Sequence, residues 1–375
     1  MAKLGEICTI VSGSTPKTSV TSYWDGNIKW ITPAELNEDT FYIMDSVRHI
    51  TEEGKEKTGL SYLPTGTVIL SSRAPIGKTA IAGCEMCCNQ GFKNLICSDA
   101  IYNEYLYFFL KSKTDYLNSL GRGATFKEIS KSIVENIEIP LPEVNQQKEI
   151  AEKFKKLEQL ISLRKQQLAK LDELVKARFV EEFFKKRYPT KTLDELSIGK
   201  GEYGAQSAST EYNPSRPRYV RITDVNDDGT LNDNCVSSEN ISDDTQYKLS
   251  YGDFMFARMG ATVGKAYAFL SGNQIFAGYL IRYKLNLSLV NPRYLFWYTK
   301  LDEYQTWVKL NQSGAAQPGI NAKKYGSLKI PVPPIELQNQ FATFVERVEK
   351  QKQTVQQSLE KLELMKKALM QEYFG

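Results

Sequence analysis

The sequence predicts a chain of mixed α and β structure (α+β class), in which two copies of one globular domain are joined by two long antiparallel coiled-coil helices with pseudo-twofold symmetry. Three observations predict this fold. Short segments recur at an offset close to 190 residues, a Pro-x-Pro segment closes each copy, and a long stretch without proline or glycine follows each Pro-x-Pro segment. In the 375-residue chain we therefore expect domains at 1–143 and 189–333, and helices at 144–188 and 334–375.

Matched segments occur in the same order in both halves of the chain. The stretch 73–78, which ends in Gly-Lys, recurs at 258–265 with two extra residues, and from Gly123 onward the offset stays at 191 residues. The other matched pairs are 4–7 with 193–196, 30–32 near 221–223, 123–125 with 314–316, and 139–142 with 330–333. A repeat of this order and length indicates two copies of one fold.

The first part of each copy alternates β-branched and aromatic runs with Gly, Asn and Asp, which is typical of short strands separated by turns. Residues 68–70 and 254–256 are predicted strands, and 103–113 and 292–300 are predicted short helices. The Pro-x-Pro segments that follow can continue neither a helix nor a central strand, so they end each domain.

The stretches beyond the Pro-x-Pro segments predict two long helices that pack against each other. Each runs for about 40 residues, or roughly 60 Å at 1.5 Å per residue. Their apolar residues alternate between spacings of four and three, and this average repeat of 3.5 is the seam of a coiled coil. The seam residues are Ile150, Phe154, Leu157, Ile161, Leu168, Leu171 and Val175 in the first helix, and Phe341, Val345, Val348, Val355, Leu359, Leu362 and Leu369 in the second. Polar residues interrupt the seam at Arg164, Arg178, Lys352 and Lys366.

An apolar strip on so long a polar helix needs a partner of equal length, and the chain carries one. Because a globular domain separates the two stretches, we expect an antiparallel pair with one domain at each end of a helical rod. The alternative is two independent, solvated helices, each of which docks on its own domain, and the sequence alone leaves that alternative open.

The composition is that of an ordinary globular protein. Hydrophobic residues make up 41% of the chain and charged residues 25%, which excludes disordered and collagen-like classes. No apolar run approaches the roughly 18 residues of a membrane span, and residues 1–6 have no apolar signal core, so we expect a cytoplasmic protein without membrane contact. The net charge of +4 is too mild to indicate a nucleic-acid partner by itself.

Motifs for catalysis are missing from the sequence. The chain has one histidine, His49, which leaves no Ser-His-Asp triad or multi-histidine metal site. There is no Gly-x-Gly-x-x-Gly loop, and 77–79 resembles the end of a phosphate-binding loop but has Ser72 where the first glycine is needed. The acidic pairs 227–228 and 243–244 are interpreted as loop and cap residues rather than cation ligands. We therefore expect no catalytic residues and no cofactor in this chain.

Four of the six cysteines cluster at Cys84, Cys87, Cys88 and Cys97. A structural zinc site needs four ligands in tetrahedral reach, and only one Cys-x-x-Cys pair is present. The matching stretch of the second copy, 271–282, has no cysteine, so the shared fold does not require a metal. Buried free thiols are the favoured interpretation, and zinc is the alternative.

Equivalent loops of the two copies concentrate glycine with basic and polar residues. Glycine lets the backbone approach a phosphate closely, and Arg, Gln and Asn can pair with base edges through two hydrogen bonds. The framework repeats while the loop residues differ, as expected of a protein that reads two unlike half-sites of DNA. The candidate DNA-binding residues are Ser14, Lys17, Arg73, Lys78, Arg122, Thr125 and Lys127 in the first copy, and Gln206, Arg221, Arg258, Lys265, Gln317 and Lys323 in the second. For any one of them, an exposed loop side chain without a DNA contact is the alternative.

With these features the chain resembles the specificity (S) subunits of Type I restriction–modification systems. The resemblance rests on the duplicated order of its motifs and spans nearly the whole chain. The residues that carry it are 139–142 followed by 146–151, 330–334 followed by 338–341, the stretch 219–225, and the paired Ile-Gly-Lys and Val-Gly-Lys segments.

The resemblance implies two target recognition domains, each of which reads one half of a split, asymmetric sequence in double-stranded DNA. It implies that the helices set the spacing of the halves and dock two modification (methyltransferase) subunits, which bring S-adenosylmethionine. Where restriction subunits are present, two of them would bring ATP- and Mg²⁺-dependent translocation and cleavage. The recognised bases, the spacer length and the presence of restriction subunits are left open.

Two other classes of function remain as alternatives. A non-catalytic coiled-coil scaffold with two protein- or glycan-binding heads explains the duplication equally well, but it does not explain Arg and Lys at matching loop positions. A self-contained modification enzyme is disfavoured because no cofactor loop is present.

Overall fold

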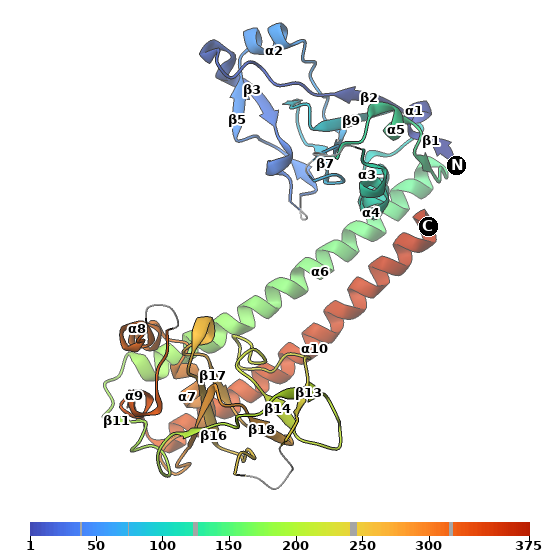
Figure 1. Ribbon diagram of the computed structural model, residues 1–375. Coiled ribbons are helices and arrows are strands. Elements are labelled where there is room, and N and C mark those ends of the chain that lie inside the picture. The colour runs from blue at the N-terminus through green and yellow to red at the C-terminus, as the bar shows by residue number, and fades with distance from the viewer. Residues whose placement is uncertain (38–39, 74, 123–126, 241–245, 315–317) are drawn as a thin grey trace. The chain divides into compact units, whose positions relative to one another are not determined.

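The computed structural model describes residues 1–375 except 38–39, 74, 123–126, 241–245 and 315–317. The chain forms two compact units (Figure 1). Unit 1 comprises Met1–Lys165 and Gln357–Gly375, and unit 2 comprises Gln166–Gln356. Two long helices, α6 (Val144–Phe179) and α10 (Ile335–Phe374), each contribute residues to both units.

The described strands of unit 1 form three small sheets. Its largest sheet has the strand order β2-β9-β6-β7-β4, antiparallel throughout except between β7 and β4. These strands are β2 (Cys8–Ser12), β4 (Tyr42–Ile43), β6 (Val68–Ser71), β7 (Thr79–Ala82) and β9 (Phe92–Cys97). The other two sheets are β5-β3-β8 and β1-β10, formed by β1 (Ala2–Lys3), β3 (Trp24–Ile31), β5 (Arg48–Ile50), β8 (Cys87–Cys88) and β10 (Glu138–Ile139).

Helix α3 (Asn103–Ser112) lies at the centre of the core of unit 1. All residues from Glu104 to Leu110 are buried, and the apolar ones join residues of β2, β6 and β9 and the start of α6 in one cluster. A helix buried on every side needs apolar residues around its whole circumference, which is why this segment reads as a continuous apolar run. The remaining helices are α1 (Leu4–Ile7), α2 (Glu52–Thr58), α4 (Thr114–Leu120) and α5 (Lys131–Glu135).

Unit 2 repeats the main elements of unit 1 in the same order, without counterparts of α2 and β4 among its described residues. Its main sheet has the order β12-β19-β16-β17, and β14 pairs with β18 in parallel, as β3 pairs with β8 in unit 1. The strands are β11 (Thr190–Thr192), β12 (Glu202–Tyr203), β13 (Ser209–Glu211), β14 (Arg218–Val220), β15 (Val236–Ser238), β16 (Asp253–Ala257), β17 (Ala266–Ala268), β18 (Gln274–Phe276), β19 (Leu280–Lys284) and β20 (Lys329–Pro331). The helices are α7 (Pro292–Tyr298), α8 (Asp302–Asn311) and α9 (Ala322–Gly326). The shared topology confirms the duplication that the sequence predicts.

A buried glutamine fixes the start of each long helix on its own unit. The Gln147 amide donates to the carbonyls of Ala100 (3.0 Å) and Pro142 (2.8 Å) and accepts from the Tyr102 N–H. Gln338, which follows it by 191 residues, donates to the carbonyls of Leu289 (3.1 Å) and Pro333 (2.8 Å) in the same way. These bonds satisfy backbone groups beside the Pro-x-Pro segments, which explains why a glutamine recurs at this position.

In both units the helices pack against each other in antiparallel order. Within unit 1, Phe154 of α6 stacks on Phe374 of α10 with ring centroids 5.6 Å apart. Within unit 2, Phe179 of α6 contacts Phe341 of α10 at 5.3 Å. The sequence therefore predicts the helix pairing correctly, and the alternative of independent helices is wrong.

Three of the polar residues that interrupt the seam, Lys366, Lys352 and Arg178, contact the facing helix. Lys366 pairs with Glu158 at 2.6 Å within unit 1, and Lys352 pairs with Asp172 at 2.5 Å within unit 2. The Arg178 guanidinium lies 4.2 Å from the centre of the Phe344 ring, a favourable cation–π distance. A charged residue can therefore replace an apolar one in this seam without being left unpaired.

The first long helix ends before Tyr188. After Phe179 the chain makes a π-helical turn, Val180–Phe184, which turns Phe183 into the core of unit 2. Phe183 contacts Tyr294 (5.0 Å) and Phe341 (5.5 Å) there. A π-helical turn holds one more residue than an α-helical turn and so redirects the side chains that follow, and periodicity in the sequence does not reveal it.

Candidate nucleic-acid interface

Loops that carry most of the described candidate DNA-binding residues meet at one edge of the main sheet in each unit, whereas Arg221 follows β14 and Lys323 lies in α9. At this edge β2 and β6 end and β9 and β7 begin, as the register Ser12–Lys93, Ser71–Phe92 and Leu70–Thr79 shows. We call these loops, together with the segment that packs on them, the loop edge. It comprises 13–17, 72–78, 89–91 and 121–128 in unit 1, and 204–207, 258–265, 277–279 and 312–320 in unit 2, of which 74, 123–126 and 315–317 lie outside the described residues.

The loop after the first strand of the main sheet passes very close to a neighbouring segment. A Cβ atom on Gly13 would lie 2.1 Å from the Asn89 carbonyl oxygen, and one on Gly204 would lie 2.2 Å from the Ala277 carbonyl oxygen. Both distances are far inside van der Waals contact, so only glycine fits at either position. The same constraint at the same place explains why glycine recurs in the two copies.

A second part of the loop edge is held by an equivalent backbone hydrogen bond in the two units. The Ile129 N–H donates to the Ser72 carbonyl at 3.0 Å, and the Ile320 N–H donates to the Arg258 carbonyl at 2.9 Å. Arg258 therefore occupies the position of Ser72, and the second copy has one extra residue in this loop. The sequence alignment, which placed Arg258 opposite Arg73 with two extra residues, is wrong by one position because an arginine occurs in both loops by coincidence.

Three candidate residues of unit 1, Lys17, Arg122 and Lys127, are exposed, while Ser14 and Arg73 are half-buried. Lys78 has an internal role, because its ammonium group donates to the carbonyls of Leu36 (2.5 Å) and Pro33 (3.3 Å). The seventh candidate, Thr125, lies outside the described residues.

In unit 2, Gln206 and Lys323 are exposed and Arg258 is half-buried, with its guanidinium 4.9 Å from the centre of the Tyr203 ring. The Tyr203 hydroxyl accepts a hydrogen bond from the Ala322 N–H, directly before Lys323, so these residues lie together. Gln317 lies outside the described residues.

Arg221 and Lys265 of unit 2 are held by carboxylates of their own unit. Arg221 pairs with the buried Asp224 at 2.8 Å, and this hydrogen bonding raises the pKa of the guanidinium. Lys265 pairs with Asp227 at 2.7 Å and lies 3.5 Å from the Val225 carbonyl. Val225 matches Leu36 in the other copy, so Lys78 and Lys265 serve the same internal contact.

Three residues at or beside the loop edge are not among the candidate DNA-binding residues that the sequence predicts. Tyr203 and Tyr279 are 43% and 56% exposed beside Arg258, whose N–H donates to the Tyr279 carbonyl. In unit 1, Lys93 is buried beneath the loops and pairs with Glu128 at 3.1 Å. An exposed tyrosine next to a loop glycine is a usable signal for the first two residues, whereas the burial of Lys93 in a strand has no signature in the sequence.

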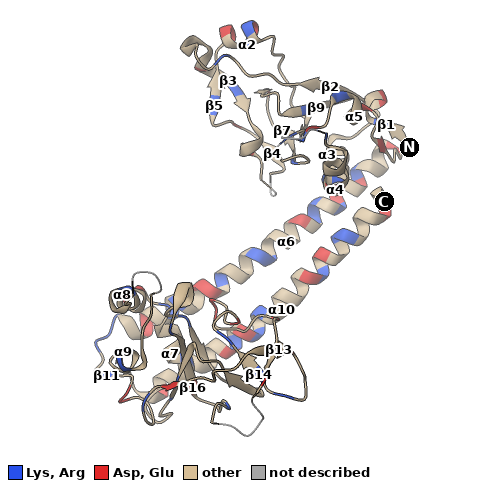
Figure 2. Cartoon of the chain, in the orientation of Figure 1, with Lys and Arg blue, Asp and Glu red and all other residues tan. Residues whose placement is uncertain are grey.

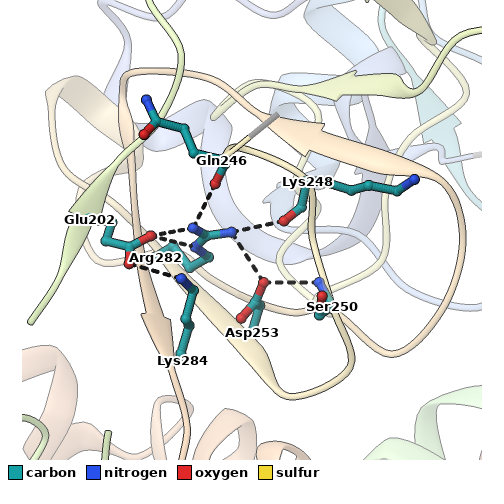
Figure 3. Close-up of polar contacts among 7 residues, drawn as sticks. All are labelled: Glu202, Gln246, Lys248, Ser250, Asp253, Arg282 and Lys284. Carbon is teal, nitrogen blue, oxygen red and sulfur yellow. Dashed lines mark hydrogen bonds and ion pairs between the residues drawn. The ribbon is translucent and has the colours of Figure 1, made fainter. Parts of the chain in front are cut away.

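A cavity of about 670 Å³ in unit 2 lies beside a buried arginine, Arg282. Figure 3 shows the polar contacts of this arginine. The Arg282 guanidinium donates to Glu202 and to the carbonyls of Lys248 and Gln246, both at 2.8 Å, and lies 3.4 Å from Asp253. Burial raises the pKa of Asp253. All of these contacts are internal, so the cluster joins the loop before β16 to the main sheet. The Arg282 guanidinium is already paired within the unit and has little charge left for a ligand.

Figure 2 shows Lys and Arg interspersed with Asp and Glu along both α6 and α10. This mixture agrees with the small net charge of +4. The helices therefore present no continuous basic stripe for the DNA backbone, and the loops remain the better candidates for phosphate contacts.

Of the four clustered cysteines, Cys87 and Cys88 are buried as expected, whereas Cys84 and Cys97 are half-buried. Burial raises the pKa of Cys87 to about 11 and that of Cys88 to about 12, which keeps both thiols protonated. Among the residues that the structure describes, no group of three or more His, Cys, Asp or Glu side chains could hold a metal ion. Asp228 accepts from Thr230 in a loop, as predicted, whereas 243–244 lie outside the described residues.

No helix in the described part of the chain has the length and apolar content needed to cross a membrane.

Comparisons with known proteins match both halves of the chain. The specificity subunit of the MjaIX Type I restriction enzyme from Methanocaldococcus jannaschii is 40% identical to this chain over 175 residues. The aligned part covers 46% of this chain and 40% of that subunit. The EcoR124I/EcoR124II specificity subunit from Escherichia coli is 26% identical over 42% of this chain and 40% of its own length. The MjaVIII specificity subunit is 22% identical over 74% of this chain and 70% of its own length. The first of these relatives is thus matched over less than half of its length.

Two solved structures share the fold along the whole chain. A chain of a type I R-M system superimposes with a TM-score of 0.63 at 17% identity, covering 100% of this chain and 96% of that one. The S subunit of a Type-I restriction-modification system from M. genitalium gives a TM-score of 0.58 at 15% identity, covering 100% of this chain and 95% of that one.

The model of the Type I restriction modification DNA specificity domain matches residues 1–173 and again residues 176–364. The repeated match agrees with the two units of equal topology and with the order of motifs in the sequence. The chain therefore belongs to the family of Type I restriction modification DNA specificity domains and contains that domain twice.

Proposed function

We propose that this chain is the DNA recognition subunit of a Type I restriction–modification complex and carries no catalysis of its own. Residues 1–143 and 189–333 are the two target recognition domains, and each reads one half of a bipartite, asymmetric sequence. The helices, at 144–188 and 334–375, set the distance between the halves and dock the modification subunits.

The observation that supports this proposal best is the loop edge. Equivalent backbone bonds hold it in both units, while the side chains it presents differ between them: Ser72 matches Arg258, for example. Direct readout of DNA needs such a combination, because the backbone fixes the position of the protein and the side chains choose the bases.

The proposed DNA contacts are residues of the loop edge, together with Lys323, which lies beside it. Lys17, Arg122 and Lys127 serve the first half-site, together with Ser14, Arg73 and Thr125. Gln206, Arg258 and Lys323 serve the second half-site, together with Gln317. Lys78, Arg221 and Lys265 act through the internal contacts described above and support the loops from behind.

The partners follow from the same proposal. Two methyltransferase subunits bind S-adenosylmethionine and modify the DNA, and two restriction subunits with ATP and Mg²⁺ complete the system where they are present. The complex acts in the cytoplasm. Because the partner subunits also contact the DNA phosphates, the small net charge of this chain is sufficient for its part in DNA binding.

The test is DNA binding with and without the modification subunit. We expect the isolated chain to bind duplex DNA weakly and in a salt-sensitive manner, and the complex to bind and methylate one bipartite sequence. Arg258→Ala should relax recognition of one half-site, whereas Lys329→Ala, at an exposed residue of β20, should leave it unchanged. A complex that methylates no bipartite sequence would contradict the proposal. Tight specific binding by the chain alone would show that the partner subunits are not needed for the phosphate contacts.

A further inference from the structure

A buried aromatic side chain donates a hydrogen bond to the same loop position in both units. In unit 1 the Trp30 indole N–H donates to the Ser14 carbonyl at 3.0 Å. In unit 2 the Tyr219 hydroxyl donates to the Ala205 carbonyl at 2.8 Å. Ser14 and Ala205 each directly follow the glycine at which the loop approaches its neighbour, and both lie in the loop edge.

The two aromatic residues occupy the same place in the fold. Trp30 faces Cys87 in the parallel pair β3–β8, and Tyr219 faces Ile275 in the parallel pair β14–β18. Each is only 3% exposed, so the donor is held rigidly by the packed ring. Two different side chains, an indole and a phenol, thus place one donor at the same point.

Further bonds extend each contact along the loop. The Trp24 indole N–H donates to the Lys17 carbonyl at 3.2 Å, and the Tyr219 hydroxyl also lies 3.2 Å from the Ser207 carbonyl. Trp24 and Trp30 pack edge to face with centroids 5.1 Å apart, so the two donors of unit 1 form one rigid element. In unit 1, the two indole donors hold both ends of the loop 13–17. In unit 2, the Tyr219 hydroxyl contacts the loop 204–207 on both sides of Gln206.

We propose that Trp30 and Tyr219 are positioning residues for DNA specificity, which fix the loop 13–17 and the loop 204–207 in the geometry that discriminates bases. This inference rests on the proposed function of the chain. A hydrogen bond to a base edge discriminates only when the side chain that makes it is held in place, because a mobile side chain adapts to the wrong base. The aromatic donors restrict the loops from the side opposite to DNA and touch no base themselves.

The substitution Tyr219→Phe tests the role of the hydroxyl, since it keeps the packed ring and removes one oxygen atom. Tyr294→Phe is the matched control. Tyr294 is also buried in unit 2, and its hydroxyl donates at the same 2.8 Å to a backbone carbonyl, that of Pro331, next to α10 instead of the loop edge. The two variants lose the same kind of bond and should lose similar stability.

Hydrogen exchange on the isolated chain gives the first readout and needs no DNA. The Gly278 N–H donates to the Ala205 carbonyl at 2.8 Å, so it reports on the loop. We expect Tyr219→Phe to speed exchange at 204–207 and 277–279 by about two- to tenfold, the effect of one hydrogen bond, and Tyr294→Phe to leave these amides unchanged. Unchanged exchange in Tyr219→Phe would show that the hydroxyl does not hold the loop and would overturn the inference.

Methylation by the complex gives the second readout. We expect Tyr219→Phe to increase methylation of sequences with a wrong base in one half-site and to leave the other half-site as strict as in the wild type. Trp30→Phe should relax the opposite half-site. If Tyr219→Phe relaxes neither half-site, or both equally, while the wild type recognises a bipartite sequence, the inference is wrong and the proposed function stands. If the wild-type complex recognises no such sequence, the proposed function fails together with the specificity role.

Discussion

At the scale of single residues, Gly204 shows how a repeated glycine follows from a close backbone contact. A methyl group there would meet the Ala277 carbonyl at 2.2 Å. We expect Gly204→Ala to destabilise unit 2 by about 1–3 kcal/mol, because the loop and β18 must move apart. Urea unfolding followed by hydrogen exchange in peptides of unit 2 measures this loss.

The control for this prediction is Gly278→Ala in the adjacent loop. Its added carbon would meet the end of the Gln206 side chain at 3.1 Å and the Ala205 carbonyl at 3.2 Å, which requires a far smaller adjustment. Equal losses of stability in the two variants would contradict the explanation by close approach.

The loop lysines separate internal contacts from contacts with DNA. Lys78 donates to two carbonyls, whereas Lys127 is exposed. We expect Lys78→Met to cost about 1–3 kcal/mol of unfolding free energy, because the Leu36 carbonyl loses its charged donor. We expect Lys127→Met to leave stability within about 0.5 kcal/mol and to lower the salt slope of DNA binding by about one.

Urea unfolding and DNA binding by the complex at several salt concentrations measure both effects. If Lys78→Met lowered the salt slope and kept full stability, Lys78 would be a phosphate contact, as the sequence predicts, and the internal contact would have no energetic weight.

At the scale of elements, the seam between α6 and α10 depends on a partly buried carboxylate in unit 1. Glu158, whose side chain is 22% exposed, lies 3.1 Å from Lys111 and 2.6 Å from Lys366. We expect Glu158→Gln to cost roughly 1–2 kcal/mol, because two ammonium groups then face each other without a counter-charge. Glu363→Gln is the control, since Glu363 is 51% exposed and 3.7 Å from Lys165, and it should cost at most about 0.5 kcal/mol.

Urea unfolding at low and high salt distinguishes the two variants. A loss in Glu158→Gln that shrinks at high salt supports the electrostatic explanation, while equal small losses in both variants would show that the seam is held by its apolar residues alone.

The elements that the sequence predicts well are those with local signatures. The 4,3 spacing from Ile150 to Val175 is a property of one helix, and the Pro-x-Pro segments act on their immediate neighbours. The end of α6 is less well predicted, because the π-helical turn at Val180–Phe184 depends on where Tyr294 and Phe341 lie in the folded unit. Tertiary packing decides that boundary, and the pattern along the chain contains no trace of it.

The sequence marks candidate loops but does not show where they lie or what their side chains contact. Glycine and basic residues mark the loops at 13–17 and 72–78, and only the structure places both at the same edge of the main sheet. The sequence does not reveal that Lys78 turns inward to Leu36, 42 residues away, or that Trp30 reaches Ser14 across 16 residues. Such contacts join separate segments of the chain, and they exist only once the unit has folded.

At the scale of the whole molecule, duplication provides two units of one framework, which are the two proposed readers of DNA. The same four segments form the loop edge in each unit, and the same buried glutamine fixes the long helix that follows. Mutations in the loops can therefore change one half-site while the sheets, the helix anchors and the other unit remain as they are. A chain built in this way can acquire new recognition sequences by exchange of loops or of whole units.

The helices are the proposed ruler between the half-sites, and their length gives the last prediction. One heptad adds about 10 Å to a helix at 1.5 Å per residue, which corresponds to roughly three base pairs at 3.4 Å each. We expect matched heptads, inserted after Lys165 in α6 and after Gln356 in α10, to lengthen the spacer of the recognised sequence by roughly three base pairs. The insertions keep the 3.5-residue repeat, so the seam continues through them.

Methylome sequencing of cells that express the chain with its modification subunit measures the spacer directly. A heptad in α6 alone is the control, because it leaves unequal helices and should abolish methylation at any single spacer length. If the matched insertions leave the spacer unchanged and both half-sites are still methylated, something other than the helices sets the distance. The recognition role would then survive, whereas the proposed role of α6 and α10 as a ruler would be wrong.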